Sequence, residues 1–128
     1  MDRTLISSGS PYEPVIGFSR AVRVGPHVYV SGTAPIAADG GEPPPDAYGQ
    51  TRRCLDIVVA ALADAGAGPE DVVRTRIYAT SAHFLDEVAR AHGEVFGGIR
   101  PASTYIVVSG FLDARWLVEL EAEALIAQ

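Results

Sequence analysis

The sequence has little cysteine and no long apolar run, and both shortages narrow what the chain can be. Its single cysteine, Cys54, excludes a disulfide within the chain, and no Cys/His pairs stand at the spacing of zinc ligands. We therefore predict a metal-free protein suited to a reducing cytoplasm. No segment approaches the roughly 18 apolar residues of a membrane span, and the first residues lack the basic and apolar regions of an export signal. We expect neither membrane insertion nor export.

Positive charge is scarce as well. The chain has 10 Lys and Arg residues against 16 Asp and Glu, which gives a net charge of -6 and an isoelectric point near 4.9. Proteins that bind nucleic acid without sequence preference neutralise its phosphates with Lys and Arg. We therefore expect no nucleic-acid partner.

Length and periodicity indicate one α+β domain. With 128 residues, 48% of them hydrophobic, the chain can form a single core, so we predict one domain over residues 1–128. Runs typical of strands cover residues 4–8, 18–24, 27–33, 72–80, 103–109 and the segment up to 124. Residues 10–14 carry two prolines, and we expect an extended loop there. The order β-β-β-α-β-α-β-β predicts one mixed sheet with two helices packed on one face.

Caps and glycines bound the two predicted helices. Asp46 caps the first and Gly66 closes it, whereas Ser81 caps the second and Gly97 closes it. The apolar stripe of the first helix contains Thr51, Cys54, Leu55, Val58, Leu62 and Ala65, and that of the second contains Phe84, Leu85, Val88, His92, Val95 and Phe96. No basic or histidine neighbour lies within a turn of Cys54 on its face. We therefore interpret this thiol as a core residue rather than a nucleophile.

The stretch from Arg100 to Ala124 predicts a strand, a short connection and a return strand, arranged as a hairpin. In the return strand, apolar side chains alternate with carboxylates, so Glu119, Glu121 and Glu123 share one face. Three carboxylates on one strand face fit a solvated edge. A carboxylate enclosed in a cleft would instead be a candidate acid or base.

This stretch resembles the signature of the RidA/YjgF family of small reactive-imine deaminases, and the likeness covers nearly the whole chain. The segments that carry it, in family order and spacing, are Ile6-Ser7, Ile16-Gly17-Phe18-Ser19-Arg20-Ala21-Val22, Tyr29-Val30-Ser31-Gly32, Asp71-Val72-Val73-Arg74-Thr75 and the carboxyl-terminal stretch from Arg100. The resemblance implies the chorismate-mutase-like fold and a homotrimer with ligand clefts between subunits. It also implies hydrolysis of a small enamine or imine metabolite to a ketone and ammonia, without a metal or organic cofactor.

An uncovered sheet face also favours self-association. Simple alternation groups Tyr78, Tyr105, Val107 and Leu117 on the face that the helices leave open. Such an apolar patch usually marks an interface. A homotrimer of the kind found in the family would cover it.

Glu119 matches the glutamate of the family motif, and we predict it as the general base that acts on water. The alternative is a structural partner of Arg100 or Arg76. The family arginine that holds the substrate carboxylate is replaced here by Ser103. Because a hydroxyl cannot reproduce the bidentate grip of a guanidinium, we predict a changed substrate.

Other cleft positions depart from the family pattern too. Phe18 stands in place of a tyrosine and Ala89 in place of an asparagine. The small side chains at Ala89 and Ser103 would widen the cleft, and Phe18 and Tyr105 would line it with aromatic surface. The remaining predicted ligand contacts are Ser31, Gly32, Arg76 and His92.

Two of these residues have a structural alternative. Arg76 could supply the missing guanidinium, or it could form a salt bridge to the glutamates of the last strand. His92 could take part in catalysis, or it could be a satisfied core histidine on an apolar helix face.

Three kinds of function therefore stay open at the level of sequence. The first is an enzyme that transforms a small imine, enamine or enol-like metabolite with Glu119 as base. The second is a trimer that binds a small ligand without turnover. The third is a purely structural partner protein.

Overall fold

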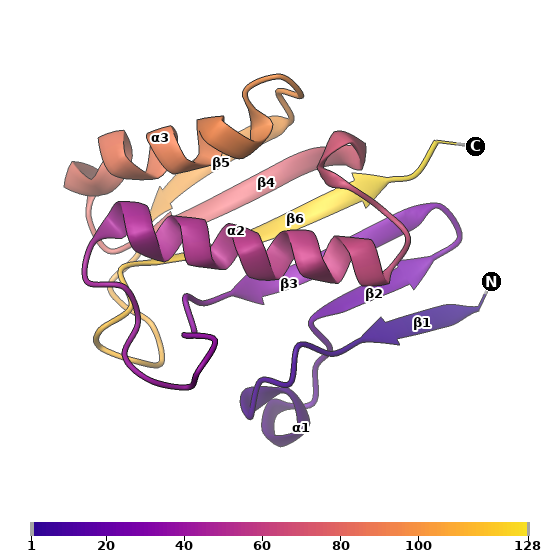
Figure 1. The fold of residues 1–128 in the computed structure, drawn as a ribbon, viewed down its shortest axis with the longest axis horizontal. Coiled ribbons are helices and arrows are strands. Elements are labelled where there is room, and N and C mark those ends of the chain that lie inside the picture. The colour runs from indigo at the N-terminus through magenta and orange to yellow at the C-terminus, as the bar shows by residue number, and fades with distance from the viewer. Residues whose placement is uncertain (1, 128) are drawn as a thin grey trace.

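Within residues 2–127, six strands form one mixed sheet, and two long helices cover one of its faces (Figure 1). The computed structural model describes residues 2–127; Met1 and Gln128, the ends of the predicted domain, lie outside the described residues. The strands are β1 (Arg3–Ile6), β2 (Ala21–Val24), β3 (His27–Thr33), β4 (Val72–Ala79), β5 (Ala102–Val107) and β6 (Val118–Leu125). The helices are α1 (Tyr12–Ile16), α2 (Ala47–Asp64) and α3 (Leu85–Phe96).

The strand order is β1-β2-β3-β6-β4-β5, with β4 and β5 parallel and the other pairs antiparallel. The predicted α+β class, with α2 and α3 on one face of a mixed sheet, is confirmed. Within residues 2–127, no helix has both the length and the apolar character needed to cross a membrane.

Helix α2 begins where the sequence places its cap. The Asp46 carboxylate accepts a hydrogen bond of 2.8 Å from the Gly49 amide. At the other end Gly66, with a φ of 86°, lets the Ala67 amide donate to the Leu62 carbonyl at 2.8 Å. The buried stripe of α2 includes Cys54, Leu55, Val58 and Leu62. It packs against β3 and β6, as the periodicity predicts.

Helix α3 follows a 3-10 turn (Ala82–Phe84), and Ser81 caps this turn by accepting a hydrogen bond of 3.0 Å from the His83 amide. Val88, Ala91 and Phe96 are buried. Leu85, predicted in the buried stripe, is 48% exposed, so its assignment is wrong. Helical periodicity fixes the direction of a side chain, but not whether a neighbouring element reaches far enough to cover it.

The extended loop predicted for residues 10–14 is wrong, because α1 begins there. Pro11 has helical dihedral angles, with φ of -65° and ψ of -18°. Pro11 and Pro14 fall before or within the first turn, where amide hydrogens have no partner inside the helix, so neither proline disrupts it. Gly17, with a φ of 90°, ends this short helix.

Strands β5 and β6 are not neighbours, so the predicted carboxyl-terminal hairpin is wrong. Strand β4 lies between them and pairs with both (Figure 1). The connecting segment, residues 108–117, is long enough to carry the chain from one side of β4 to the other. Strand residues alone do not choose between these pairings.

The register of β5 also overturns the predicted apolar face. Tyr105 and Val107 pair with Ile77 and Ala79, which are buried on the helix side of the sheet. Tyr78 points to the opposite side, because neighbouring strand residues alternate. Tyr105 and Val107 therefore do not share the open face with Tyr78.

Two other face assignments change as well. Val73, predicted on the helix side, is 50% exposed, because the β4–β6 register shifts between Val72 and Arg74 and Val72 takes the buried place. Leu117, the fourth member of the predicted apolar face, is half-buried and packs against the core.

Candidate functional site

A bulge in β3 brings Gly32 beside Glu119. The pairing of β3 with β6 slips by one residue between Val30 and Thr33, which leaves an extra residue on β3. A methyl group at Gly32 would lie 3.4 Å from the Oε1 atom of Glu119. Any residue larger than glycine at this position would therefore reduce the space around the Glu119 carboxylate.

The buried residue Arg20, which is only 4% exposed, holds this bulge in place. Its Nη1 atom donates to the Gly32 carbonyl at 2.7 Å, to Thr33 Oγ1 at 3.0 Å and to Ser31 Oγ at 3.2 Å. The Arg20 Cζ atom also lies 5.3 Å from the centre of the Phe18 ring. Three of the predicted ligand contacts, Phe18, Ser31 and Gly32, are thus brought together around one buried guanidinium.

The Glu119 carboxylate lies half-buried on this cluster. It makes no hydrogen bond or salt bridge with any other residue between 2 and 127, so the predicted structural pairing with Arg100 or Arg76 is not formed. Burial raises the pKa of Glu119, and the positive charge of Arg20 lowers it in part. A carboxyl group of this kind, free to meet a ligand, can exchange protons with water.

Ser103 and His92 belong to a second cluster, on β5, β4 and α3. The buried Thr75 hydroxyl donates to Ser103 Oγ at 2.7 Å and lies 2.9 Å from His92 Nε2. The imidazole packs on the Phe96 ring at 4.8 Å, and burial lowers the pKa of His92. His92 is therefore a hydrogen-bonded residue of the helix–sheet boundary, packed on Phe96.

The other two predicted residues of this region lie nearby on the same elements. The Tyr105 hydroxyl donates to the Ser81 carbonyl at 2.7 Å, and burial raises the pKa of Tyr105. Ala89 is exposed on the surface of α3. Neither contacts Glu119 within the chain.

The two clusters do not form one site in a single chain. Glu119 pairs with Tyr78 on the open face, whereas Ser103 pairs with Thr75 on the helix side. Glu119 and Ser103 are two strand spacings and three residues apart in the sheet, which is about 14 Å between their backbones. Their side chains point to opposite faces of the sheet.

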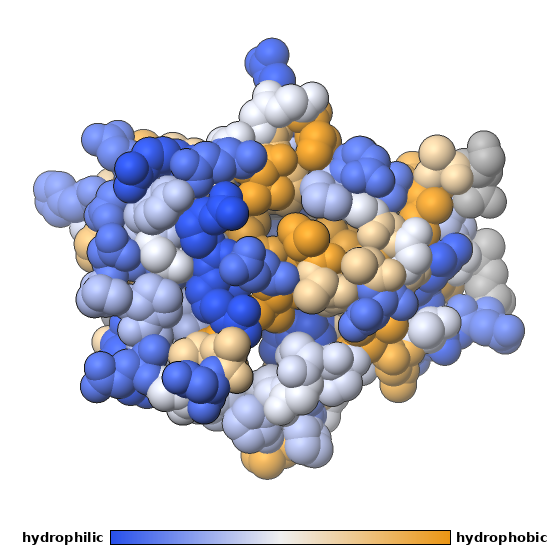
Figure 2. All heavy atoms as spheres, in the orientation of Figure 1, coloured by the Kyte–Doolittle hydropathy of each residue, from blue (hydrophilic) through white to orange (hydrophobic). Residues whose placement is uncertain are grey.

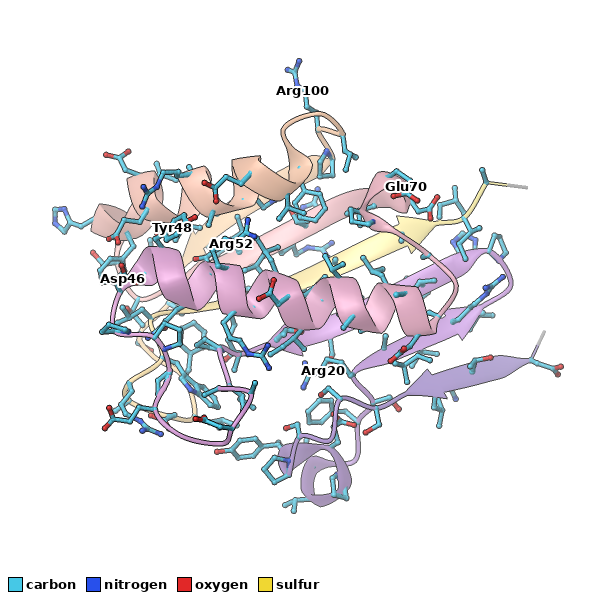
Figure 3. The ribbon with its side chains drawn as sticks, viewed as in Figure 1. Arg20, Asp46, Tyr48, Arg52, Glu70 and Arg100 are labelled. Atoms are coloured by element: carbon cyan, nitrogen blue, oxygen red, sulfur yellow. The ribbon has the colours of Figure 1, made fainter. Side chains whose placement is uncertain are left out.

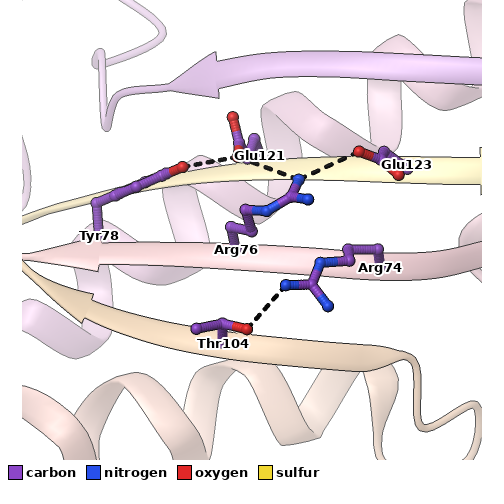
Figure 4. A network of polar contacts seen from close by, with 6 residues as sticks. All are labelled: Arg74, Arg76, Tyr78, Thr104, Glu121 and Glu123. Carbon is purple, nitrogen blue, oxygen red and sulfur yellow. Dashed lines mark hydrogen bonds and ion pairs between the residues drawn. The ribbon is translucent and has the colours of Figure 1, made fainter.

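Arg76 is engaged elsewhere, as its structural alternative predicted. Its Nη1 atom lies 3.3 Å from Glu121 and 3.1 Å from Glu123, and the Tyr78 hydroxyl donates to Glu121 at 2.7 Å (Figure 4). The hydrogen bond to Glu123 is the main reason that the pKa of Arg76 is raised. The open face of the sheet thus carries a polar network rather than an apolar patch.

Neither a thiol nucleophile nor a metal centre is present among the described residues. Cys54 is fully buried, and this burial raises its pKa well above the usual value, so the thiol stays protonated in the core. Across residues 2–127, no group of three His, Cys, Asp or Glu side chains could hold a metal ion.

Sequence reasoning missed Arg20 and Thr75 as members of these clusters. Arg20 stands in a segment that carries the family resemblance, between Ser19 and the apolar start of β2. Its acceptors are created by the β3 bulge, which the sequence does not mark. Thr75 gave no signal either, since a threonine on a strand is ordinary.

Comparisons with known proteins show the family of this chain. A family model described as endoribonuclease L-PSP matches residues 9–126. The chain is 43% identical to an uncharacterised protein of Streptomyces coelicolor, over 93% of this chain and 89% of that one. It is 31% identical to a RutC family protein of Pyrococcus abyssi, over 97% of this chain and 98% of that one.

A solved structure supports the same assignment. The crystal structure of Rv2704 from Mycobacterium tuberculosis, a member of the YjgF/YER057c/UK114 family, superposes with a TM-score of 0.89. The two sequences are 43% identical, and the match covers 98% of this chain and all of that one. This chain therefore belongs to the RidA/YjgF family.

Proposed function

We propose that the protein deaminates, or otherwise transforms, a small imine or enamine metabolite with Glu119 as general base. The observation that carries this proposal is the free Glu119 carboxylate, half-buried beside the Gly32 bulge and the Arg20 guanidinium. Membership of the RidA/YjgF family supports a role toward small metabolites.

In this reaction water attacks the carbon of the C=N bond while Glu119 accepts a proton from the water. Glu119 passes this proton to the nitrogen, which gives a carbinolamine with a hydroxyl and an amino group on the same carbon. It then takes the hydroxyl proton of that intermediate and delivers it to the amino nitrogen as the C–N bond breaks, and the products are a ketone and ammonia. A carboxyl group with a raised pKa suits both steps, because it holds a proton closer to neutral pH than an ordinary glutamate.

We further propose that the reaction takes place in a cleft between subunits of a homotrimer. In one chain, the Glu119 cluster and the Ser103 cluster lie on opposite faces of the sheet. Rotational symmetry can bring one cluster of a protomer against the other cluster of its neighbour. The half-exposed Tyr29, on the same open face as Glu123, adds apolar surface that a neighbour would cover.

Ser103 sets the expected substrate class. This residue is exposed, and no guanidinium stands in its place on β5. Arg76 is held by Glu121 and Glu123, so it is not free to compensate from the neighbouring strand. We therefore expect a substrate whose binding does not depend on a carboxylate beside the C=N carbon.

The description endoribonuclease in the family model does not fit the charge of this chain. The open face carries Glu121 and Glu123, and the net charge is -6. Such a surface repels the phosphates of RNA.

Ammonia release from a panel of imines, generated in place by amino-acid oxidases, tests the proposal. Glu119→Gln should lower turnover by about 10²- to 10⁴-fold, the usual scale for a general base. The matched control is Glu123→Gln, which removes a carboxylate from the same face of β6 and should change turnover less than about twofold. Equal turnover in Glu119→Gln would contradict the assignment. Retention of a bound metabolite without turnover of any imine would favour the alternative, a ligand-binding trimer.

A further inference from the structure

A cavity of about 260 Å³ lies between α2, residues 8–11 before α1 and the segment that follows β3. Its lining includes two arginines, Arg20 and Arg53, and no carboxylate from residues 2–127. In the space-filling view the surface between α2 and α1 is hollowed, with hydrophilic residues at its floor (Figure 2). A cavity with this charge pattern stands out in a chain whose net charge is -6.

Arg20 leaves one end of its guanidinium open. Its Nε atom donates to Ser8 Oγ at 3.2 Å, and its Nη1 atom is fully used by the β3 bulge. The Nη2 atom has no acceptor among the described residues, and it keeps some contact with solvent. Figure 3 shows the Arg20 side chain in the space between α2 and α1. Two N–H groups of a buried, charged side chain are therefore available to a ligand in the cavity.

Arg53 supplies a second set of donors from α2. Its Nε atom donates to the Ile36 carbonyl at 2.6 Å, which holds the side chain against the far wall of the cavity. Its two Nη atoms make no hydrogen bond or salt bridge with residues 2–127. The neighbouring Arg52 differs, because it is turned away and pairs with Glu94 at 3.3 Å.

Glu13, a carboxylate whose charge acts on Arg20, is already satisfied by other donors. Glu13 accepts hydrogen bonds from the Ser8 amide at 3.1 Å, the Ser8 hydroxyl at 2.7 Å and the Ser10 amide at 3.3 Å. The Ser10 hydroxyl oxygen accepts from the Tyr12 amide, so its proton is free. The cavity is therefore rich in donors and poor in acceptors.

The remaining wall is mainly apolar, with Ile36, Ala37 and Ile57 among the lining residues. Two guanidiniums beside aliphatic side chains fit a ligand with one anionic and one apolar part. We propose that this cavity binds a small organic anion, a carboxylate with a short apolar chain, through Arg20 and Arg53.

Binding of butyrate, followed by the amide resonances of Gly9, Ala34 and Gly40 in NMR spectra, tests this proposal. Butyrate should shift these resonances and saturate at millimolar concentration, whereas butyramide, its neutral counterpart, should not. Arg53→Gln should weaken butyrate binding about tenfold or more, because a charge-assisted contact is lost. Arg52→Gln removes the same charge one residue away and should change the affinity less than about twofold.

A second variant keeps both arginines and reduces the space. Ile57→Phe should abolish the shifts that butyrate causes, while the other amide resonances keep the positions of the folded protein. Equal weakening by Arg53→Gln and Arg52→Gln would overturn the proposal, because it would show general electrostatic attraction. Equal binding of butyramide, unchanged binding in Ile57→Phe, or shifts that never saturate would also overturn it. None of these outcomes depends on turnover by Glu119.

Discussion

Replacing Arg20 with lysine should destabilise the fold by about 3 kcal/mol while keeping the positive charge. In the native protein Arg20 serves four acceptors from two nitrogens, and three of them, Ser31 Oγ, the Gly32 carbonyl and Thr33 Oγ1, are bound by the same Nη1 atom. A lysine has one nitrogen on a narrower head, so it cannot reach Ser8 and the bulge at once. Each buried acceptor left without a donor costs roughly 1–3 kcal/mol, and water from the adjacent cavity recovers part of that loss.

Urea-induced unfolding at fixed protein concentration measures this cost, since self-association would otherwise change the apparent stability. The control is Arg52→Lys, which alters one exposed ion pair with Glu94 and should change the free energy of unfolding by less than about 0.5 kcal/mol. A loss in Arg20→Lys no larger than in the control would refute the view that Arg20 fixes the bulge beside Glu119.

Three further predictions concern charge, substrate and assembly. Burial raises the pKa of Glu119 in the folded state, so ionisation of this residue costs stability as the pH rises. Glu119→Gln should therefore be more stable than the native protein at pH 8. This gain in stability should vanish below the ordinary glutamate pKa of 4.5. A constant difference across pH would contradict this. Ser103→Arg should raise ammonia release from carboxylate-bearing imines by about 10- to 100-fold, and no gain would argue against a changed substrate. Light scattering should give three times the chain mass of 13.5 kDa, and a monomer mass at micromolar concentration would exclude the shared cleft.

Local patterns in the sequence were sufficient for most secondary elements. The two ends of α2 could be predicted from Asp46 and Gly66, because a cap and a left-handed glycine act within one helical turn. The prediction for α1 was wrong because Pro11 and Pro14 restrict an extended chain and a first helical turn alike.

Pairing between strands was beyond the sequence. The face of Tyr105 depends on its register with β4, and β4 lies between β5 and β6 although it precedes both in the chain. Alternation shows which residues share a face, but not which face meets the helices. The predicted apolar patch failed for this reason.

The family resemblance selected Glu119, Gly32 and Phe18 as site residues, and the structure brings them to one cluster. Arg20 was missed because its importance comes from acceptors created by the β3 bulge, and a bulge leaves no mark in the sequence. The separation of Ser103 from Glu119 follows from the strand order and from the register of β4 with β5 and β6.

Complementation between two inactive variants tests the shared cleft most directly. Glu119→Gln lacks the general base but keeps Ser103 on β5. Ser103→Trp keeps Glu119 but fills the cleft beside β5 with a large side chain. In trimers formed from equal amounts of both chains, about one cleft in four should combine an intact Glu119 with an intact neighbouring Ser103. Activity on the imine that the native protein turns over fastest should therefore return to about a quarter of the native value. Mixed trimers that stay inactive would contradict the account, because they would place both residues in a site within one chain.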